Sequence, residues 1–188
     1  MQAGLITAAG ASRRMGSPKA LLRLRNGQFL AAHQAELLIQ AGCDPVTIVI
    51  GAEAERLQSA LPDCPLTVNP HWQEGRLTSI KAGLTALGPF DGCLIMPVDA
   101  VGIQRATIKA VCAAGKKGGH AVIRPTLRTQ PGHLVWISND IAQLLLETEL
   151  PPDTPLNEWL APHTHKLELP DPALIRNINT PEDWEHLL

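Results

Sequence analysis

A run of five consecutive β-branched residues, at positions 46–50, constrains the fold more than any other feature of this sequence. A strand with one solvated face alternates apolar and polar residues, whereas an unbroken run is expected of a strand that is buried on both faces. Residues 93–98 form a second short apolar run. Strands of this kind belong mainly to parallel sheets that helices cover on both sides. The two runs therefore predict an α/β protein.

Segments with a helical spacing of apolar residues separate the predicted strands. The expected strands cover residues 46–50, 66–68, 93–98, 121–123, 133–137 and 166–169, and Leu5 and Ile6 belong to an earlier one. The expected helices cover residues 29–41, 52–61, 75–87, 104–114, 140–147 and 181–188, and residues 21–24 are expected to be extended. This alternation implies right-handed crossovers and a three-layer fold, with a mostly parallel sheet and helices on both faces, as in Rossmann-like proteins. No repeat or low-complexity tract divides the chain, so we expect residues 1–188 to form a single domain.

Composition argues against several classes of function. A net charge of −2 gives no electrostatic basis for binding nucleic acid or a membrane surface. No apolar run reaches membrane-spanning length, and the first residues lack the pattern of a signal peptide. The four cysteines are widely spaced and form no C-x-x-C pair, which is typical of a reduced protein with buried thiols. We therefore expect a cytoplasmic protein that has neither a nucleic-acid nor a membrane partner.

The loop that follows the first apolar run has the composition of a phosphate-binding loop. Small residues open it at positions 8–10, and they let the backbone approach a ligand and point successive N–H groups at an anion. Arg14 and Lys19 add positive charge that suits a polyphosphate. The spacing fits neither a Walker A loop nor a dinucleotide fingerprint, because five residues separate Gly10 from Gly16 and the lysine comes three residues later.

The carboxylate of Asp99 is a second candidate for chemistry, because it directly follows the 93–98 strand. Ligands of open α/β sheets bind beyond the carboxyl ends of the strands, where the 8–19 loop, Gly51 and Asp99 are all expected. A helix cap is the alternative role for Asp99, but the next helix is expected to start only near Gln104. Mg²⁺ is commonly held by one or two carboxylates together with substrate phosphates. The sequence therefore predicts that Asp99 is a Mg²⁺ ligand.

Residues 180–183 have the pattern of a helix N-terminus. Thr180 is placed as the cap, Pro181 at the first helical position and Asp183 as the acid of a capping box. His163 and His165 are separated by one residue, without a carboxylate or thiol at metal spacing, and this pattern indicates a solvated strand end.

Several ordered segments resemble motifs of the MobA/MocA-like nucleotidyltransferases. The opening loop is similar to the family signature, with Thr7 where the family usually has Leu, and it matches at Ala8, Ala9, Gly10, Ser12, Arg14, Met15, Gly16, Lys19, Leu21 and Leu22. Residues 97–99 resemble the family's Pro-x-Asp-x-Pro motif, although Val101 stands in place of the second proline. Three further segments resemble family motifs, and they cover residues 69–84, 131–133 and 177–179.

The resemblance implies a nucleotidyltransferase fold and assigns roles to individual residues. Arg14, Lys19 and Asp99 would be catalytic, and Asp99 would hold Mg²⁺. The nucleotide would be bound by Ala8, Ala9, Gly10, Ser12, Arg14, Met15, Gly16, Lys19, Gly51, Asn69, Gly75 and Ser79. The acceptor would be bound by Gly132, His133, Asn177 and Asn179.

The implied reaction moves a nucleoside monophosphate from an NTP to a phosphate-bearing acceptor, by resemblance a molybdopterin, and releases pyrophosphate. The start at residues 8–10 is similar to the cytidylyltransferase branch and favours CTP, whereas the amide pair at residues 177 and 179 is similar to the guanylyltransferase branch. The resemblance also implies transient contact with a molybdoenzyme or its chaperone. Two alternatives stay open: a sugar-phosphate acceptor, and a regulatory protein that binds NTP without turnover.

Overall fold

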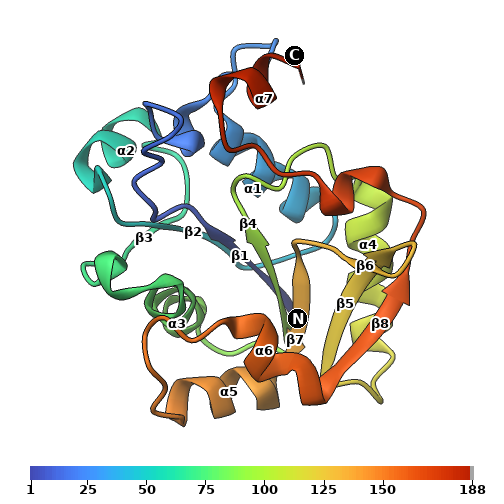
Figure 1. The fold of residues 1–188 in the computed structure, drawn as a ribbon. Coiled ribbons are helices and arrows are strands. Elements are labelled where there is room, and N and C mark those ends of the chain that lie inside the picture. The colour runs from blue at the N-terminus through green and yellow to red at the C-terminus, as the bar shows by residue number, and fades with distance from the viewer. Residues whose placement is uncertain (187–188) are drawn as a thin grey trace.

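A single eight-stranded sheet forms the centre of the protein in the computed structural model, which describes residues 1–186 (Figure 1). The strands lie in the order β3-β2-β1-β4-β7-β5-β6, and β8 pairs with β5. Their bounds are β1 (Gln2–Thr7), β2 (Val46–Ile50), β3 (Leu66–Val68), β4 (Gly92–Pro97), β5 (Val122–Leu127), β6 (Gln130–Pro131), β7 (Val135–Ser138) and β8 (Thr164–Glu168).

The sheet is mixed: its first four strands along the chain are parallel, and most pairings of the later strands are antiparallel. Strands β3, β2, β1 and β4 are parallel neighbours, and β8 runs parallel to β5. Strand β7 runs antiparallel to both β4 and β5, and β6 runs antiparallel to β5. The predicted mostly parallel sheet is confirmed, and the antiparallel β7 is a feature that strand–helix alternation alone does not reveal.

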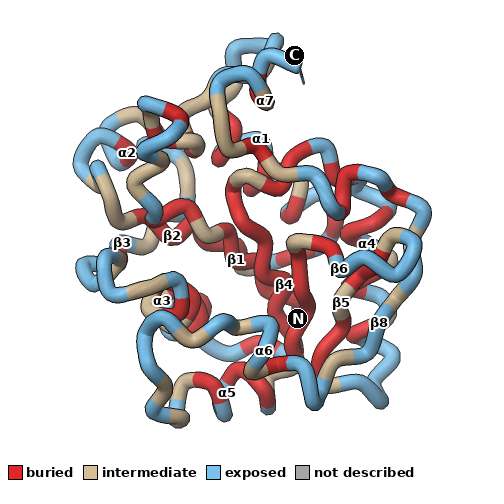
Figure 2. The backbone as a smooth tube through the Cα atoms, viewed as in Figure 1, coloured by how far each residue is buried: buried red, intermediate tan, exposed pale blue. Residues whose placement is uncertain are grey.

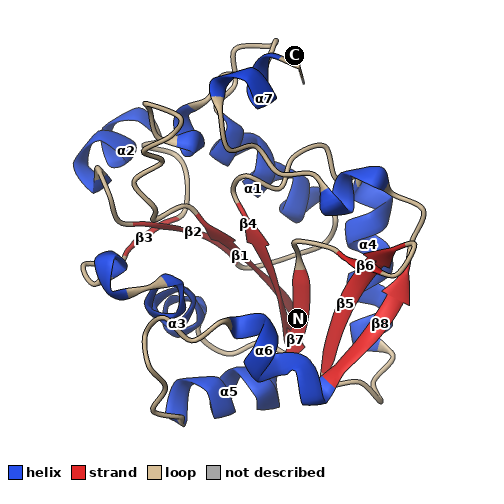
Figure 3. Ribbon diagram, in the orientation of Figure 1, coloured by secondary structure: helices blue, strands red, loops and turns tan. Residues whose placement is uncertain are grey.

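Helices cover both faces of this sheet, which confirms the three-layer α/β prediction (Figure 3). The α-helices are α1 (Leu30–Gln40), α2 (Ala54–Ala60), α3 (Arg76–Leu87), α4 (Arg105–Lys116), α5 (Asn139–Glu147), α6 (Leu156–Leu160) and α7 (Pro181–Glu185). Short 3₁₀ helices cover Lys19–Leu21, Trp72–Glu74, Ala161–His163 and Pro172–Ile175. No helix among residues 1–186 is long and apolar enough to cross a bilayer.

The core consists of two apolar layers, one on each face of the sheet, and the buried backbone of β1 and β4 lies between them (Figure 2). Alternating side chains of β1 divide between the layers: Ile6 packs with α1 and α4, and Leu5 packs with α3 and α5. Gly83 of α3 permits this second contact, because a Cβ there would lie 2.5 Å from the Leu5 Cδ1 atom. Close packing of α3 on β1 places the N-terminus of α3 beside the loop that follows β1.

Three expectations about local structure are confirmed in part. The extended segment expected at residues 21–24 begins one residue later, because Leu21 ends the 3₁₀ helix Lys19–Leu21. Leu22 is extended, and Arg23 forms an antiparallel bridge with Phe29. His163 directly precedes β8 and His165 lies on it, and both are exposed, which agrees with the expected solvated strand end. His165 also stacks on His120 with ring centroids 3.7 Å apart. Helix α7 ends at Glu185, and residues 187–188 of the helix expected there lie outside the described part of the chain.

Candidate active site

The loop of residues 8–19 leaves β1 at the carboxyl edge of the sheet and is held there by backbone contacts. The Ala8 N–H donates to the Val49 carbonyl at 2.8 Å, and the Ala52 N–H donates to the Ala9 carbonyl at 2.9 Å. Ser12 has a positive φ of 47°, and its hydroxyl accepts from the Lys19 N–H at 3.2 Å. Met15 is buried in the core beneath the loop. Ser12 and Met15 therefore fix the shape of the loop.

A cavity of about 270 Å³ lies between this loop and the N-terminus of α3, and we call it the first cavity. It is lined by Thr7, Ala8, Ala9, Gly10, Ser12, Lys19, Ala20, Trp72, Gly75, Arg76, Ser79, Pro97, Val98 and Asp99. Most of the residues predicted to bind nucleotide are on this wall, together with Asp99. Residues that are far apart in the sequence thus meet at the edge where an α/β sheet is expected to bind its ligand.

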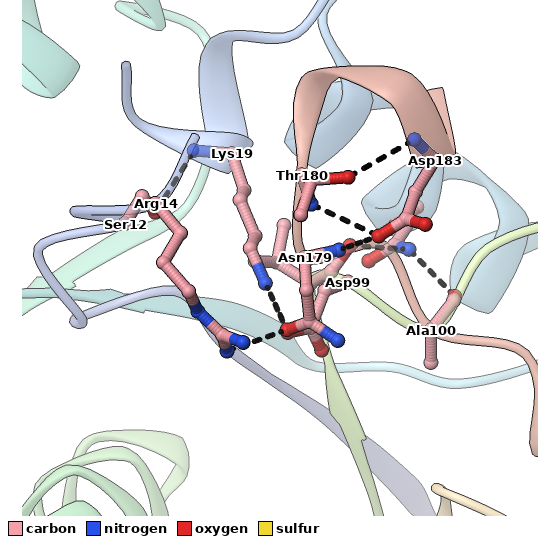
Figure 4. Close-up of polar contacts among 10 residues, drawn as sticks. Ser12, Arg14, Lys19, Asp99, Ala100, Asn179, Thr180 and Asp183 are labelled. Atoms are coloured by element: carbon pink, nitrogen blue, oxygen red, sulfur yellow. Dashed lines mark hydrogen bonds and ion pairs between the residues drawn. The ribbon is translucent and has the colours of Figure 1, made fainter. Parts of the chain in front are cut away.

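The charged groups of this site bond to one another (Figure 4). The Lys19 Nζ donates to Asp99 Oδ2 at 2.7 Å and to Asn179 Oδ1 at 3.2 Å. The Arg14 guanidinium donates to the same Asn179 oxygen at 3.2 Å. The Lys19 and Asp99 side chains are only 12% and 16% exposed, so little water screens their ion pair. Three chain segments are joined at this cluster.

Asp99 is not a helix cap. Helix α4 begins at Arg105 after Gln104, and the Gln104 N–H donates instead to Asp171 Oδ2 at 3.0 Å. Asp99 lies in a loop that the buried Gln34 side chain holds in place. The Gln34 amide donates to the carbonyls of Val98 and Ala100, which flank Asp99, at 2.9 Å each. The cap alternative is therefore wrong, and the carboxylate points into the first cavity.

The oxygen atoms around Asp99 fit a hard divalent cation. Asp99 Oδ1 and Asn177 Oδ1 are both buried and have no hydrogen-bond partner among the described residues. The Ile178 N–H donates to the Asp99 carbonyl at 3.2 Å, which brings the 177–179 segment alongside the carboxylate. Residues 1–186 contain no cluster of three or more His, Cys, Asp or Glu side chains. An ion held here would need further oxygens, and substrate phosphates are the usual source for Mg²⁺.

The segment that carries Asn179 is fixed by the predicted capping box, which the structure confirms. The Asn179 and Thr180 N–H groups donate to Asp183 Oδ2 at 2.8 and 2.9 Å, and the Asp183 N–H donates to the Thr180 hydroxyl at 3.3 Å. The Asn179 N–H contributes most to lowering the pKa of the Asp183 carboxyl, followed by the Thr180 N–H. The start of α7 thus holds the Asn179 amide toward Lys19.

Four residues predicted to bind nucleotide do not line the first cavity, and a fifth, Arg14, joins the site through Asn179. The Asn69 amide is buried, donates to Thr78 and Ser79 at 2.9 Å each, and accepts from the His71 N–H. Gly51 lies beneath Trp72, where a Cβ would come within 2.5 Å of the Trp72 side chain. The other two are Met15, which is in the core, and Gly16, which is exposed in the loop. Asn69, Gly51 and Met15 thus shape the surroundings of the first cavity, and Gly16 lies outside its wall.

A second cavity of about 220 Å³ adjoins the first and shares Thr7, Arg76 and Pro97 with it. His133, which is predicted to bind the acceptor, lines it, and the neighbouring Gly132 N–H donates to the Pro125 carbonyl at 2.8 Å. The other predicted acceptor residues are not part of this wall, since Asn179 lies with Lys19 and Asn177 lies in the same segment. The structure therefore separates the four predicted acceptor residues into two groups.

Sequence reasoning missed the cations Arg76 and Arg124, which line the second cavity. One signal was available for Arg76, because it stands at the first position of a helix directly after Gly75. A cation is unfavourable at the positive end of the helix dipole, so its presence there is better explained by a ligand than by helix stability. Arg124 lies in a strand and offered no comparable signal.

The fold and the site have the features of an α/β protein that binds its ligand at the carboxyl edge of the sheet. Residues 4–167 match the family of MobA-like NTP transferase domains. The chain belongs to this family.

Relatives with assigned functions include two nucleotidyltransferases of molybdenum cofactor synthesis. A probable molybdenum cofactor guanylyltransferase of Opitutus terrae is 34% identical over 143 residues, which cover 74% of this chain and 68% of the relative. The molybdenum cofactor cytidylyltransferase of Escherichia coli is 26% identical over 184 residues, which cover 96% and 92%. A nicotine blue oxidoreductase of Paenarthrobacter nicotinovorans is 34% identical over 118 residues, and the match spans only 57% of its length.

The fold is shared with solved structures. Rv0371C of Mycobacterium tuberculosis, solved as a complex with manganese, superposes with a TM-score of 0.77 at 21% identity and covers 100% of this chain and 97% of that one. At this level of identity the likeness shows the fold alone.

Proposed function

We propose that this protein is a Mg²⁺-dependent nucleotidyltransferase that moves a nucleoside monophosphate from an NTP to a phosphate-bearing acceptor. The observation that carries the proposal is a pair of adjoining cavities with a shared wall. The first cavity is lined by the 8–19 loop and the Lys19–Asp99 pair, and the second is lined by Arg76, Arg124 and His133. A transfer between two bound phosphates needs this arrangement, because the acceptor must reach the α-phosphorus of the nucleotide.

In the proposed reaction an oxygen of the acceptor phosphate attacks the α-phosphorus and forms a new P–O bond. The bond from the α-phosphorus to the oxygen that bridges to the β-phosphorus breaks, and pyrophosphate leaves with that electron pair. Reactions of this type depend mainly on positioning and charge neutralisation. Lys19 and Arg14 supply positive charge at the loop, where the triphosphate would bind and the pyrophosphate would depart.

Asp99 would hold the divalent ion through Oδ1, with the amide oxygens of Asn177 and Asn179 nearby. When bound, Mg²⁺ supplies Lewis-acid polarisation of the phosphate and neutralises triphosphate charge. Support for a metal also comes from the manganese complex of the structural neighbour Rv0371C. The nitrogen of Lys19, now paired with Asp99, then becomes available for the triphosphate.

CTP is the proposed nucleotide and a molybdopterin the proposed acceptor. The first cavity is small for a ligand site, since such sites usually measure about 300–1,000 Å³. Ala9 lies on its wall, and its methyl group would crowd a purine that approached the backbone. The relatives do not distinguish the two nucleotides, because a cytidylyltransferase and a probable guanylyltransferase each align with 96% of this chain. GTP and a sugar phosphate are the competing substrates.

Two measurements test this proposal. Calorimetric titration with the four NTPs and Mg²⁺ should show tightest binding for CTP, and a GTP preference would contradict the nucleotide assignment. Pyrophosphate release should then require a molybdopterin. Release with a sugar phosphate instead would change the acceptor, and NTP binding without turnover on any acceptor would indicate a regulatory protein.

A further inference from the structure

The second cavity contains buried polar atoms that the protein itself does not satisfy. Arg124 Nε and His133 Nε2 are both inaccessible to water and have no hydrogen-bond partner among the described residues. Both residues line this cavity, Arg124 from β5 and His133 from the segment before β7. Buried polar groups in native proteins are nearly always hydrogen-bonded, so these two side chains are unusual, and the cavity beside them is a candidate ligand site.

The charge of the cavity wall favours an anion. Arg76 lines the wall together with Arg124, and no ion pair within residues 1–186 involves either guanidinium. Burial lowers the pKa of Arg124, and the neighbouring charge of Arg76 lowers it further. Both effects mean that the guanidinium lacks a compensating negative group. Asp153 is the one carboxylate on the wall. Asp153 and Arg76 are both exposed to solvent, so the half-buried positive charge of the cavity is that of Arg124.

The shape of the cavity is set by a close contact between two loops. A Cβ at Gly75 would lie 2.2 Å from the Pro152 carbonyl oxygen and 3.0 Å from the Asp153 nitrogen. Only glycine therefore lets residues 152–157 lie over the N-terminus of α3 and close the cavity on that side. Leu77, Ile80, Ile95 and Val135 complete the wall. A ligand with an anionic end and a less polar body fits this lining.

We propose that Arg124, with Arg76 and His133, forms the subsite that binds the phosphate monoester of the acceptor. The inference rests on the proposed transferase function and adds the residues that recognise its second substrate. A guanidinium suits this task, because its planar fork can donate two parallel hydrogen bonds to a phosphate. Arg76 lies on the wall shared by the two cavities, so a phosphate held beside it faces the loop where the triphosphate would bind.

Inorganic phosphate is the probe that tests this subsite directly. The protein is first saturated with Mg²⁺ and a CTP analogue whose α–β bridge is a methylene group, so that the first cavity is filled. Phosphate is then titrated and followed by ³¹P NMR. Arg124→Gln should weaken phosphate binding at least about tenfold, as expected for the loss of a charge-assisted contact. The phosphate affinity of Arg124→Lys should lie between those of the wild type and Arg124→Gln, because lysine keeps the positive charge but lacks the planar guanidinium.

The matched control is Lys166→Gln, which removes one positive charge from β8 directly opposite Arg124 in the strand register. Lys166 is exposed and does not line the cavity, so phosphate affinity should not change. Equal weakening by both variants would overturn the proposal, since it would show a general effect of net charge. Unchanged phosphate affinity in Arg124→Gln would overturn it as well.

Kinetics with the acceptor provide a second readout that a merely structural role would not give. Arg124→Gln should raise the KM for the acceptor at least about tenfold and leave the affinity for CTP unchanged. An equal loss of CTP affinity would place Arg124 in the triphosphate site and overturn the inference. If the protein binds no NTP, the transferase proposal fails. Phosphate titration of the wild type and of Arg124→Gln, both without nucleotide, still decides whether the anion subsite exists.

Discussion

The first and second cavities share a wall but differ in how their charges are balanced. In the first, the Lys19 ammonium is paired with the Asp99 carboxylate, and the Asn179 amide oxygen accepts from both Lys19 and Arg14. In the second, Arg124 has no partner among the described residues and positive charge is in excess. An anion can add directly to the second cavity, whereas a ligand of the first must exchange partners with groups that are already bonded.

This exchange suits a ligand that brings both signs of charge. A metal–triphosphate complex offers a cation to Asp99 and an anion to Lys19, so the ion pair is replaced on both sides. A free triphosphate would leave Asp99 without a partner, and a free metal ion would do the same to Lys19. We therefore expect Mg²⁺ and NTP to strengthen each other's binding, and linkage requires the two effects to be equal.

The largest expected effect comes from Asp99→Asn, which keeps the shape of the side chain and removes its charge. Mg²⁺-dependent turnover should fall at least about 100-fold, because a metal contributes several kcal/mol of charge stabilisation. Added Mg²⁺ should restore part of the rate. Without ligands, the free energy of unfolding should fall by about 1–2 kcal/mol, since Lys19 loses a largely buried partner.

The loss of stability is expected because the Asp99 carboxylate forms an ion pair with Lys19. Phosphate binding in the second cavity should be unaffected by Asp99→Asn. Full Mg²⁺-dependent turnover in the variant would remove Asp99 from the mechanism.

Lys19→Ala should have the next largest effect. Losing one charge-assisted contact to the triphosphate should cost about 1.5–3 kcal/mol of transition-state stabilisation, which is about 10- to 150-fold in kcat/KM. Urea denaturation should show lower stability as well, because Asp99 is left alone. In a double-mutant cycle with Asp99→Asn, the two losses of stability should be less than additive. Additive losses would mean that the ion pair contributes nothing to folding.

A smaller effect is expected for Ala9→Gly, which removes a methyl group from the wall of the first cavity. The ratio of CTP to GTP affinity should fall severalfold, on the scale of one methylene group in a pocket. Calorimetric titration of both nucleotides measures the ratio. Because Ala9 does not line the second cavity, phosphate affinity there serves as the control, and an unchanged ratio would show that position 9 does not select the base.

The smallest effect is expected for Asp183→Asn, which alters the carboxylate that holds Asn179 near the first cavity. Hydrogen bonds lower the pKa of this carboxyl in the folded state, so its contribution to stability is present above the unfolded pKa of about 3.9. That contribution is lost as the pH falls through the lower folded pKa. Urea denaturation from pH 6 to pH 3 should show a weaker acid dependence in Asp183→Asn than in the wild type. CTP affinity should fall slightly, and phosphate affinity should not change.

Features that depend on neighbours along the chain were predictable from the sequence. The β-branched run gave β2 with its observed bounds, the small residues and cations of 8–19 marked the loop, and Asp99 was placed at the end of a strand. The capping box at Thr180 was likewise correct, because caps are made within one turn. The prediction of a single domain remains a prediction.

The second cavity was decided by the tertiary structure. Arg124 gains its role only because β5 lies antiparallel to β7 and because residues 152–157 cross the start of α3 over Gly75. Asp99 and Lys19 were each predicted, but their pairing joins residues 80 positions apart. Local propensity carries no information about which distant side chains share a cavity, and burial there determines whether a charge is paired or left for a ligand.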